Sequence, residues 1–186
     1  MGLPLSAPHL SYGGIDVEGR EIAVRRVAST RMPTRWGMFE ADGYEQTCAD
    51  GKVETALVIS LGDLRRSAPL LRIHSQCFTG EILGSMRCDC GDQLTLAMQA
   101  IANEGRGLVI YEYQEGRGIG LMAKLRAYEM QDAGLDTIQA NQALGYMADC
   151  RDLQSSDRYI ARAQDNPRET SIKQYRQGAG LVTCGH

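Results

Sequence analysis

The sequence predicts an α/β domain in which a mixed sheet is flanked by helices. Three observations lead to this prediction. Short β-branched or aromatic runs, separated by Gly, Pro and Asp, occupy the first half of the chain, as is typical of strands. Apolar residues recur at helical spacing in the second half. Between two helical segments, "GLVIYEY" and "QEGRGIG" have the pattern of a strand and a glycine-rich turn, which indicates a βα unit.

Most of the expected strands precede the first helix. The β-branched and aromatic runs lie in residues 20–30, 36–44, 53–63 and 69–75. A fifth apolar run, Gly107–Tyr113, is expected to be a buried strand. Residues 1–20 contain Gly and Pro without periodicity, so we expect a flexible N-terminal arm followed by a single domain, residues 21–186.

The first expected helix begins just past Asp92 and ends before Gly105. Asp92 is a candidate N-cap, because its carboxylate can accept hydrogen bonds from the first unpaired amides. The apolar stripe of this helix consists of Leu94, Ala97, Met98 and Ile101. This spacing favours a helix that packs one face against the sheet.

Further helices are expected after the glycine-rich turn. The longer one covers residues 121–134 and has Gly134 in C-terminal position. Its apolar stripe consists of Leu121, Leu125 and Tyr128. A shorter helix is expected within Thr137–Asp149, and another around Thr170–Gln177, where the sequence is more polar.

The composition is that of an ordinary globular protein. Of the 186 residues 43% are apolar and 23% are charged, and the formal net charge is −3. Acidic and basic residues are mixed along the chain, so no extended positive field is available for a nucleic-acid polymer. No apolar run reaches the roughly eighteen residues that a membrane-spanning helix needs. We therefore expect a cytosolic protein that binds neither nucleic-acid polymer nor membrane.

Three of the six cysteines cluster in "CFTGEILGSMRCDCGDQ", at Cys77, Cys88 and Cys90. Disulfides rarely persist in a reducing cytosol, so clustered cysteines indicate metal binding or redox chemistry. Zinc prefers thiolates in a tetrahedron, and three protein ligands would leave a position for water. Three thiolates also overneutralise the ion, so a nearby base or positive group would help. The scattered cysteines, which we assign no role, are Cys48, Cys150 and Cys184.

Two alternatives remain open for this cluster. His74 stands three residues before Cys77 and could act as a fourth ligand, which would make the site closed and structural. The cysteines could also be buried thiols without a metal, as single cysteines usually are.

The segment "EGRGIG", Glu115–Gly120, places three glycines at alternate positions before a helix. Such a loop lets backbone amides approach an anion, and Arg117 can add a bidentate clamp on phosphate oxygens. The pattern is neither the dinucleotide fingerprint nor the nucleoside-triphosphate loop. Considered alone, it is compatible with a phosphate site or with a simple turn.

Together these segments resemble the GTP cyclohydrolase II family, which opens riboflavin synthesis. The motifs that carry the resemblance are "RIHSQCFTGEILGSMRCDCGDQL", "QEGRGIGLMAKLRAYEMQDAGLDT" and "LGYMADCRD", in family order. The similarity covers about residues 27–153 and includes "MPTRWGMFEADGY" near its start. It implies a cyclohydrolase II-like α/β fold, a homodimer, and hydrolysis of GTP to formate, pyrophosphate and a diaminopyrimidinone ribosylamine 5′-phosphate.

The resemblance also implies roles for individual residues. One Zn²⁺ per subunit would be held by Cys77, Cys88 and Cys90, with Mg²⁺ bound to the triphosphate. The residues matched to GTP contacts are Arg72, Ile73, His74, Ser75, Gln76, Gln93, Glu115, Gly116, Arg117 and Thr137. On this assignment, His74 belongs to the nucleotide pocket and the metal site keeps an open position.

Three further positions match catalytic residues of the family. Asp149 matches a proton acceptor, Arg151 a nucleophile, and Tyr128 a tyrosine that acts near the base during ring opening. A guanidinium stays protonated in proteins, so we expect Arg151 to stabilise phosphoryl charge while Asp149 holds it. Core packing is the simpler explanation for Tyr128, and a surface ion pair is the simpler explanation for the other two.

The chain departs from the family pattern at several positions. Tyr113 stands where an arginine is usual, and Glu81 where an aspartate is usual. A downstream "TNNP" motif is replaced by "QDNPRET", Gln164–Thr170, and Arg168 is a poor substitute for a lysine at phosphate. Three hypotheses follow: an enzyme that acts on GTP, a related enzyme that acts on another nucleotide or base, or a catalytically silent homologue that binds zinc or nucleotide.

Overall fold

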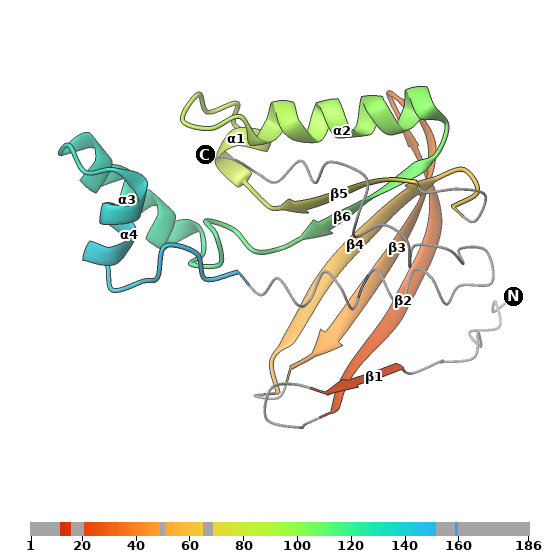
Figure 1. Ribbon diagram of the computed structural model, residues 1–186, viewed down its shortest axis with the longest axis horizontal. Coiled ribbons are helices and arrows are strands. Elements are labelled where there is room, and N and C mark those ends of the chain that lie inside the picture. Colours follow the sequence, from red (N-terminus) through yellow and green to blue (C-terminus); the bar gives the residue numbers. More distant parts are fainter. Residues whose placement is uncertain (1–11, 16–20, 49–50, 65–68, 152–158, 160–186) are drawn as a thin grey trace, which may run out of the picture.

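The computed structural model describes residues 12–15, 21–48, 51–64, 69–151 and 159. In this part of the chain one six-stranded sheet has the order β1-β2-β3-β4-β6-β5 (Figure 1). The strands are β1 (Tyr12–Ile15), β2 (Glu21–Thr34), β3 (Gly37–Thr47), β4 (Val53–Leu61), β5 (Leu70–Ser75) and β6 (Gly107–Glu112). All neighbours are antiparallel except β5 and β6, which are parallel. The predicted α/β fold with a mixed sheet is confirmed.

The five strands expected from the sequence are all present, and β1 is an additional one. Residues Tyr12–Ile15 pair with β2, although no β-branched or aromatic run predicts a strand there. This strand lies inside the segment expected to be an N-terminal arm. The division into an arm and one domain, residues 1–20 and 21–186, stays a prediction.

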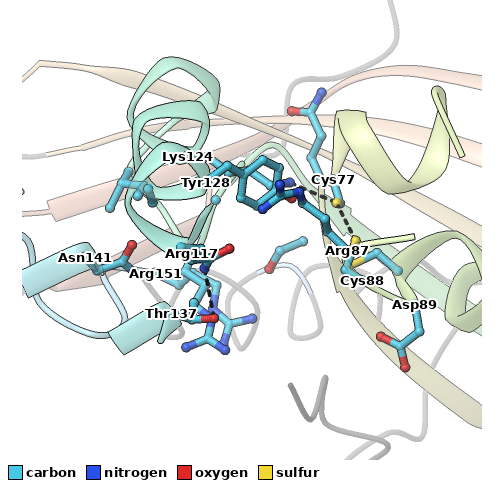
Figure 2. A pocket seen from close by; sticks show the side chains of 17 residues that line it. Cys77, Arg87, Cys88, Asp89, Arg117, Lys124, Tyr128, Thr137, Asn141 and Arg151 are labelled. Carbon is cyan, nitrogen blue, oxygen red and sulfur yellow. Dashed lines mark hydrogen bonds between the residues drawn. The ribbon is translucent and has the colours of Figure 1, made fainter. Parts of the chain in front are cut away.

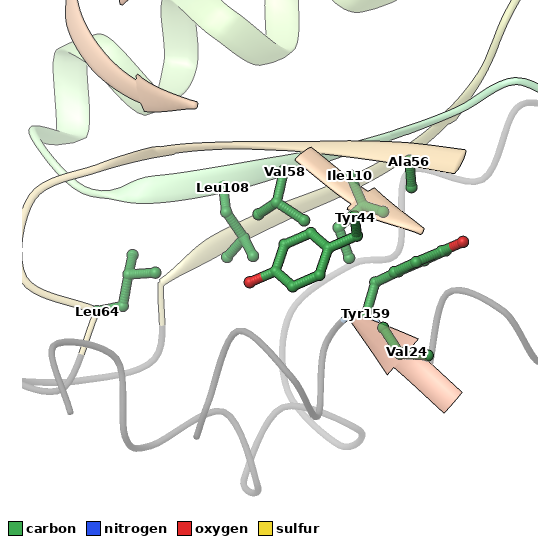
Figure 3. Close-up of a cluster of buried hydrophobic side chains, with 8 residues drawn as sticks. All are labelled: Val24, Tyr44, Ala56, Val58, Leu64, Leu108, Ile110 and Tyr159. Carbon is green, nitrogen blue, oxygen red and sulfur yellow. The ribbon is translucent and has the colours of Figure 1, made fainter. Parts of the chain in front are cut away.

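Both faces of the sheet carry apolar side chains. Along β6, Leu108 and Ile110 belong to one buried cluster and Val109 to the other, as the alternation of a strand requires. The first cluster contains Tyr44 of β3 and Tyr159, whose ring centroids are 6.1 Å apart (Figure 3). The second cluster lies under α2 (Cys90–Glu104), so α2 is fixed against the sheet.

The start of α2 differs from the prediction. Asp92 was expected to be the N-cap, but the helix begins at Cys90 and Asp89 occupies the N-cap position without a side-chain cap bond. Asp92 lies in the first turn, where a carboxylate favours the helix dipole. At the other end Gly105 has a left-handed φ of 71°, as expected of a helix-terminating glycine.

The remaining helices are α1 (Phe78–Glu81), α3 (Leu121–Asp132) and α4 (Thr137–Ala143). No helical spacing of apolar residues in the sequence predicts α1. Helix α4 begins at a capping box between Asp136 and Gln139 and stops well before Asp149. The helix expected around Thr170–Gln177 lies outside the described residues.

The predicted apolar stripe of α3 is wrong. Leu125 is 41% exposed, whereas Ala127 is buried. Figure 1 shows why: α3 and α4 lie beyond the ends of β5 and β6 instead of covering the sheet. A helix there faces the loops at those strand ends. Among the described residues no helix is both long and apolar enough to span a bilayer.

Candidate active site

The three clustered cysteines meet at the carboxyl end of β5. Cys77 follows this strand after one residue, Cys88 lies in the loop after α1, and Cys90 is the first residue of α2. The three Sγ atoms all lie within 4.8 Å of one another, and those of Cys77 and Cys88 are 3.5 Å apart. Such a set of thiols could hold a metal ion.

A glycine makes this approach of the sulfurs possible. A Cβ atom added to Gly80, in α1, would lie 2.7 Å from Cys88 Sγ and 3.2 Å from Cys77 Sγ. Gly91 has a matching role, since its Cβ would lie 2.8 Å from the Gly80 carbonyl oxygen. These distances are shorter than normal van der Waals contact. Gly80 therefore leaves room for the sulfurs, and Gly91 lets the start of α2 approach the backbone of α1.

The donor set fits a thiophilic cation such as zinc. A hydrogen bond with Cys90 lowers the pKa of Cys77 to about 3, against the effect of burial and with help from Lys124. Burial raises the pKa of Cys88. A bound cation favours the thiolate form of its ligands, which opposes that increase. Among the described residues, His74 does not belong to the cluster. A fourth ligand at His74 is therefore not what this geometry favours.

Instead, His74 lies in a buried polar network centred on Glu81. One carboxylate oxygen of Glu81 accepts a hydrogen bond from the Cys77 amide (2.6 Å) and lies 3.1 Å from His74 Nε2. The other accepts from the Tyr111 hydroxyl at 2.8 Å. Burial, followed by this bond to Glu81, raises the pKa of Tyr111 above its usual range. Glu81 thus fixes the backbone at the first cysteine of the cluster.

The network continues to the segment that carries Cys88 and Cys90. Arg72 Nη2 lies 3.4 Å from His74 Nδ1 and donates to Gln93 Oε1 at 2.5 Å. Gln93 in turn donates to Asp89 at 2.7 Å, between the two later cysteines of the cluster. Arg72 is buried and His74 is fully buried, so these side chains form a buried hydrogen-bond network next to the cluster.

A cavity of about 170 Å³ opens above the sulfurs (Figure 2). The predicted site residues that line it are Ser75, Gln76, Cys77, Cys88, Cys90, Gly116, Arg117, Tyr128, Thr137 and Arg151. The predicted site residues that do not line it are Arg72, Ile73, His74, Gln93, Glu115 and Asp149. The metal-binding, glycine-rich and Asp-x-Arg motifs, which lie far apart in sequence, therefore share one cavity.

The glycine-rich turn packs directly on the segment that carries the Asp-x-Arg pair. Arg117 has a left-handed φ of 61°, and its carbonyl accepts from the Cys150 amide at 2.9 Å. A Cβ added to Gly118, whose φ is 90°, would lie 2.6 Å from the Cys150 carbonyl oxygen. Arg117 also donates to the Ala148 carbonyl at 3.4 Å. Only a glycine at position 118 allows this close contact.

Asp149 and Arg151 form a tight pair. Arg151 Nε donates to both carboxylate oxygens of Asp149, at 2.9 and 3.1 Å. Hydrogen bonding to Arg151 holds the pKa of Asp149 below its usual range. A carboxylate with a lowered pKa is a weak base. The hydrogen bonds of Asp149 suit it instead to orient the Arg151 guanidinium at the cavity wall.

Tyr128 lies on the face of α3 that points toward the cysteines (Figure 2). Its hydroxyl is 3.3 Å from Thr79 Oγ1, which is 3.7 Å from Cys77 Sγ. The Arg87 guanidinium carbon lies 4.7 Å from the centre of the Tyr128 ring, within cation–π range. The ring is thus held in place beside the sulfurs.

Sequence reasoning missed several residues that line the cavity. These are Arg87, Asp89, Ile119, Lys124, Ala127, Gln131 and Asn141. Lys124 and Tyr128 stand one helical turn apart on α3, so the spacing i, i+4 could have indicated Lys124 once Tyr128 was assigned. Asn141, which is buried, belongs to a stretch where the sequence had suggested only a helix.

The family model for GTP cyclohydrolase II matches residues 25–161. A GTP cyclohydrolase-2 of Teredinibacter turnerae is 53% identical over 132 residues, which are 70% of this chain. Proteins of the same name from Shewanella frigidimarina and Pseudomonas fluorescens are 52% and 54% identical, over 70% and 68% of this chain. The matched segments span 65%, 63% and 60% of the three relatives.

The matched residues include all three clustered cysteines, Gly116 and Arg117 of the glycine-rich turn, and Arg151, which together line one cavity. Sequence similarity and geometry thus agree over the same part of the molecule. The chain belongs to the GTP cyclohydrolase II family.

Proposed function

We propose that this chain is a zinc-dependent hydrolase that opens the imidazole ring of the guanine base of GTP. The products would be formate, pyrophosphate and 2,5-diamino-6-ribosylamino-4-pyrimidinone 5′-phosphate, at the start of riboflavin synthesis. The observation that carries the proposal is the single cavity shared by the three-sulfur cluster, Tyr128, Arg117 and Arg151. Family membership supports the reaction class.

Cys77, Cys88 and Cys90 would hold one zinc ion. Their thiol donors and mutual distances fit this cation, and three protein ligands leave a coordination position open. When bound, zinc supplies Lewis-acid activation of water for attack on the ring. The protein's own contribution is to fix the ligand positions, through Gly80 and through the hydrogen bond from the Cys77 amide to Glu81.

Tyr128 is proposed to move a proton at a nitrogen of the imidazole ring of the base. Its hydroxyl is close to the sulfur cluster through Thr79, and its ring is fixed by Arg87. A phenol can donate or accept a hydrogen bond, which suits a proton transfer during ring opening.

Arg117 and Arg151 are proposed to bind the triphosphate, together with Mg²⁺. Both line the cavity, and a guanidinium can bind phosphate oxygens in a bidentate manner. Asp149 orients Arg151 through two hydrogen bonds and keeps its charge directed along the cavity wall. We therefore assign Arg151 to charge stabilisation of the leaving pyrophosphate, because a guanidinium remains protonated and is a poor nucleophile.

The test is product analysis by mass spectrometry. The zinc-loaded chain is incubated with GTP and Mg²⁺, and formate, pyrophosphate and the pyrimidinone are measured. Equimolar release of all three products is expected. If the loaded protein consumes no GTP and releases neither formate nor pyrophosphate, the proposal is wrong.

A second candidate is the same ring-opening chemistry on a different nucleotide or base. The observation that favours it is Tyr113, which stands where the family usually has an arginine. Its side chain is 55% exposed and packs edge-on against Tyr111, with ring centroids 5.6 Å apart. A cation is thus replaced by an aromatic ring. Equal thermal stabilisation by GTP and GMP would favour this candidate, whereas a preference for GTP would favour the first.

A catalytically silent zinc or nucleotide-binding homologue is the remaining alternative. Tyr128 and Arg151 both line the cavity, which supports an active enzyme instead. The absorption spectrum of the cobalt-substituted protein separates these cases, because a closed four-ligand site indicates a structural ion. The homodimeric state and the cytosolic location belong to this proposal, and sedimentation of the purified chain tests the dimer.

A further inference from the structure

We propose that Lys124 is a positioning residue whose ammonium group balances the negative charge of the metal-binding thiolates and is itself held by Glu115. This inference rests on the proposed metal site at the three cysteines. It gives Glu115 a task different from the nucleotide contact that the family resemblance implies. It also explains why a lysine stands on the face of α3 nearest the sulfurs.

The contacts of Lys124 are short and shielded from solvent. Its Nζ lies 3.0 Å from Cys77 Sγ (Figure 2). The same Nζ lies 2.7 Å from Glu115 Oε1. The side chains of Lys124 and Glu115 are only 12% and 9% exposed. A lysine ammonium group that contacts a carboxylate oxygen at this distance forms an ion pair. Lys124 therefore brings a positive charge to the sulfur that it contacts.

Glu115 is held independently of the lysine. Its other carboxylate oxygen accepts from the Phe78 amide at 2.6 Å, and the Gly116 amide lies 3.2 Å from Oε1. Phe78 follows Cys77 directly, so Glu115 connects the glycine-rich turn to the backbone next to Cys77. An anchored carboxylate fixes the ammonium group at one point, which a flexible surface ion pair does not do.

The charge count of the cluster explains the need for this cation. Three thiolates around a divalent ion leave one net negative charge in a partly buried site. An unbalanced charge there is costly, because the surroundings screen it less than water does. Lys124 places a positive charge in direct contact with one of the three sulfurs. Glu115 carries a negative charge of its own, so the ammonium group offsets charge at the sulfur that it contacts and does not neutralise the whole set. Partners in this outer layer typically change metal affinity about 10- to 100-fold.

Zinc affinity of the full chain, measured by competition with a chromophoric chelator, tests the inference. We expect Lys124→Met to weaken zinc binding about 10- to 100-fold, and Lys124→Arg to restore most of the affinity. Lys52→Met is the matched control, since it removes an exposed lysine outside the cavity that contains the cysteines. Cobalt-thiolate absorption should show the same number of sulfur ligands in Lys124→Met as in the unmodified chain.

Each result separates the possibilities. If Lys124→Met binds zinc as tightly as the unmodified chain and only the KM for GTP rises, Lys124 is a substrate contact and the inference is overturned. If the unmodified chain binds no zinc, the metal site itself is wrong. If Lys124→Met does not fold, Lys124→Met with Glu115→Gln removes both buried charges. Zinc affinity equal to that of Glu115→Gln alone would then overturn the inference.

Discussion

Replacing Gly80 by alanine should separate the stability of the fold from the geometry of the metal site. The new methyl group would lie 2.7 Å from Cys88 Sγ and 3.2 Å from Cys77 Sγ. Carbon makes its best contacts at roughly 3.5–4.0 Å, so Cys88 Sγ must move by about 1 Å. Zinc–sulfur bonds are about 2.3 Å long and tolerate only about 0.2 Å of variation. One of the three ligands is therefore displaced.

The fold itself should tolerate this change. The atoms that clash are the ends of cysteine side chains, which can rotate away without moving the backbone. Gly80 is not among the residues with positive φ, and alanine is favoured over glycine in a helix by up to about 1 kcal/mol. We expect the metal-free Gly80→Ala protein to unfold at the same denaturant concentration as the unmodified chain or higher. Its zinc affinity should fall at least 10- to 100-fold, or about 1.4–2.7 kcal/mol.

Two measurements on the same samples check this expectation: urea unfolding without metal, and zinc titration against a chelator. Gly43→Ala is the matched control. A Cβ there would meet its nearest neighbour at 3.6 Å, which is an ordinary contact, and the residue lies in β3. Unchanged zinc affinity in Gly80→Ala would refute the conclusion that the three sulfurs act as one ligand set.

Three further changes test the rest of the cavity. Tyr128→Phe should lower kcat for GTP about 10²- to 10⁴-fold while zinc content and thermal stability stay the same; unchanged kcat would exclude proton transfer by the hydroxyl. Gly118→Ala should destabilise the fold by about 1–3 kcal/mol in urea unfolding and raise KM for GTP, because a side chain is strained at φ 90° and would press on the Cys150 carbonyl. Asp149→Asn should be less stable than the unmodified chain at neutral pH, by less than about 1 kcal/mol because the pair is partly exposed. The pKa of Asp149 is lower in the folded than in the unfolded chain, so its ion pair stabilises the fold at neutral pH. The difference in stability should therefore be lost as the pH falls below about 4. A difference that stays constant from pH 3 to pH 7 would contradict this prediction.

The sequence predicted those features that depend on local pattern. The strand runs, the apolar stripe of α2 and its glycine end follow from residue spacing, and the structure has all of them. The cysteine cluster was predictable because cysteine chemistry and short spacing restrict the possibilities to a few. The start of α2 was not, because aspartate favours the N-cap position and both Asp89 and Asp92 could occupy it; Asp89 does so without a side-chain cap bond.

Tertiary packing decided what the sequence could not. An apolar stripe containing Leu125 was predicted for α3 from residue spacing, yet Leu125 is exposed and the helix faces the cysteine cluster through Lys124 and Tyr128. The buried network of Arg72 and His74 includes Glu81. Residue spacing does not predict that the Glu81 side chain contacts His74. Polar residues next to a binding motif are equally compatible with touching the ligand and with supporting those that do.

The crossover between β5 and β6 has a consequence for how this protein tolerates changes in length. Parallel neighbours must be joined by a long connection, and here that connection is the stretch that carries all three cysteines. Inserting residues between Leu83 and Gly84 would move two sulfurs relative to the third, whereas lengthening the hairpin at Arg35 and Trp36 leaves their spacing intact. The geometry of the cysteine cluster therefore constrains the length of the connection between β5 and β6, but not that of the turn between β2 and β3.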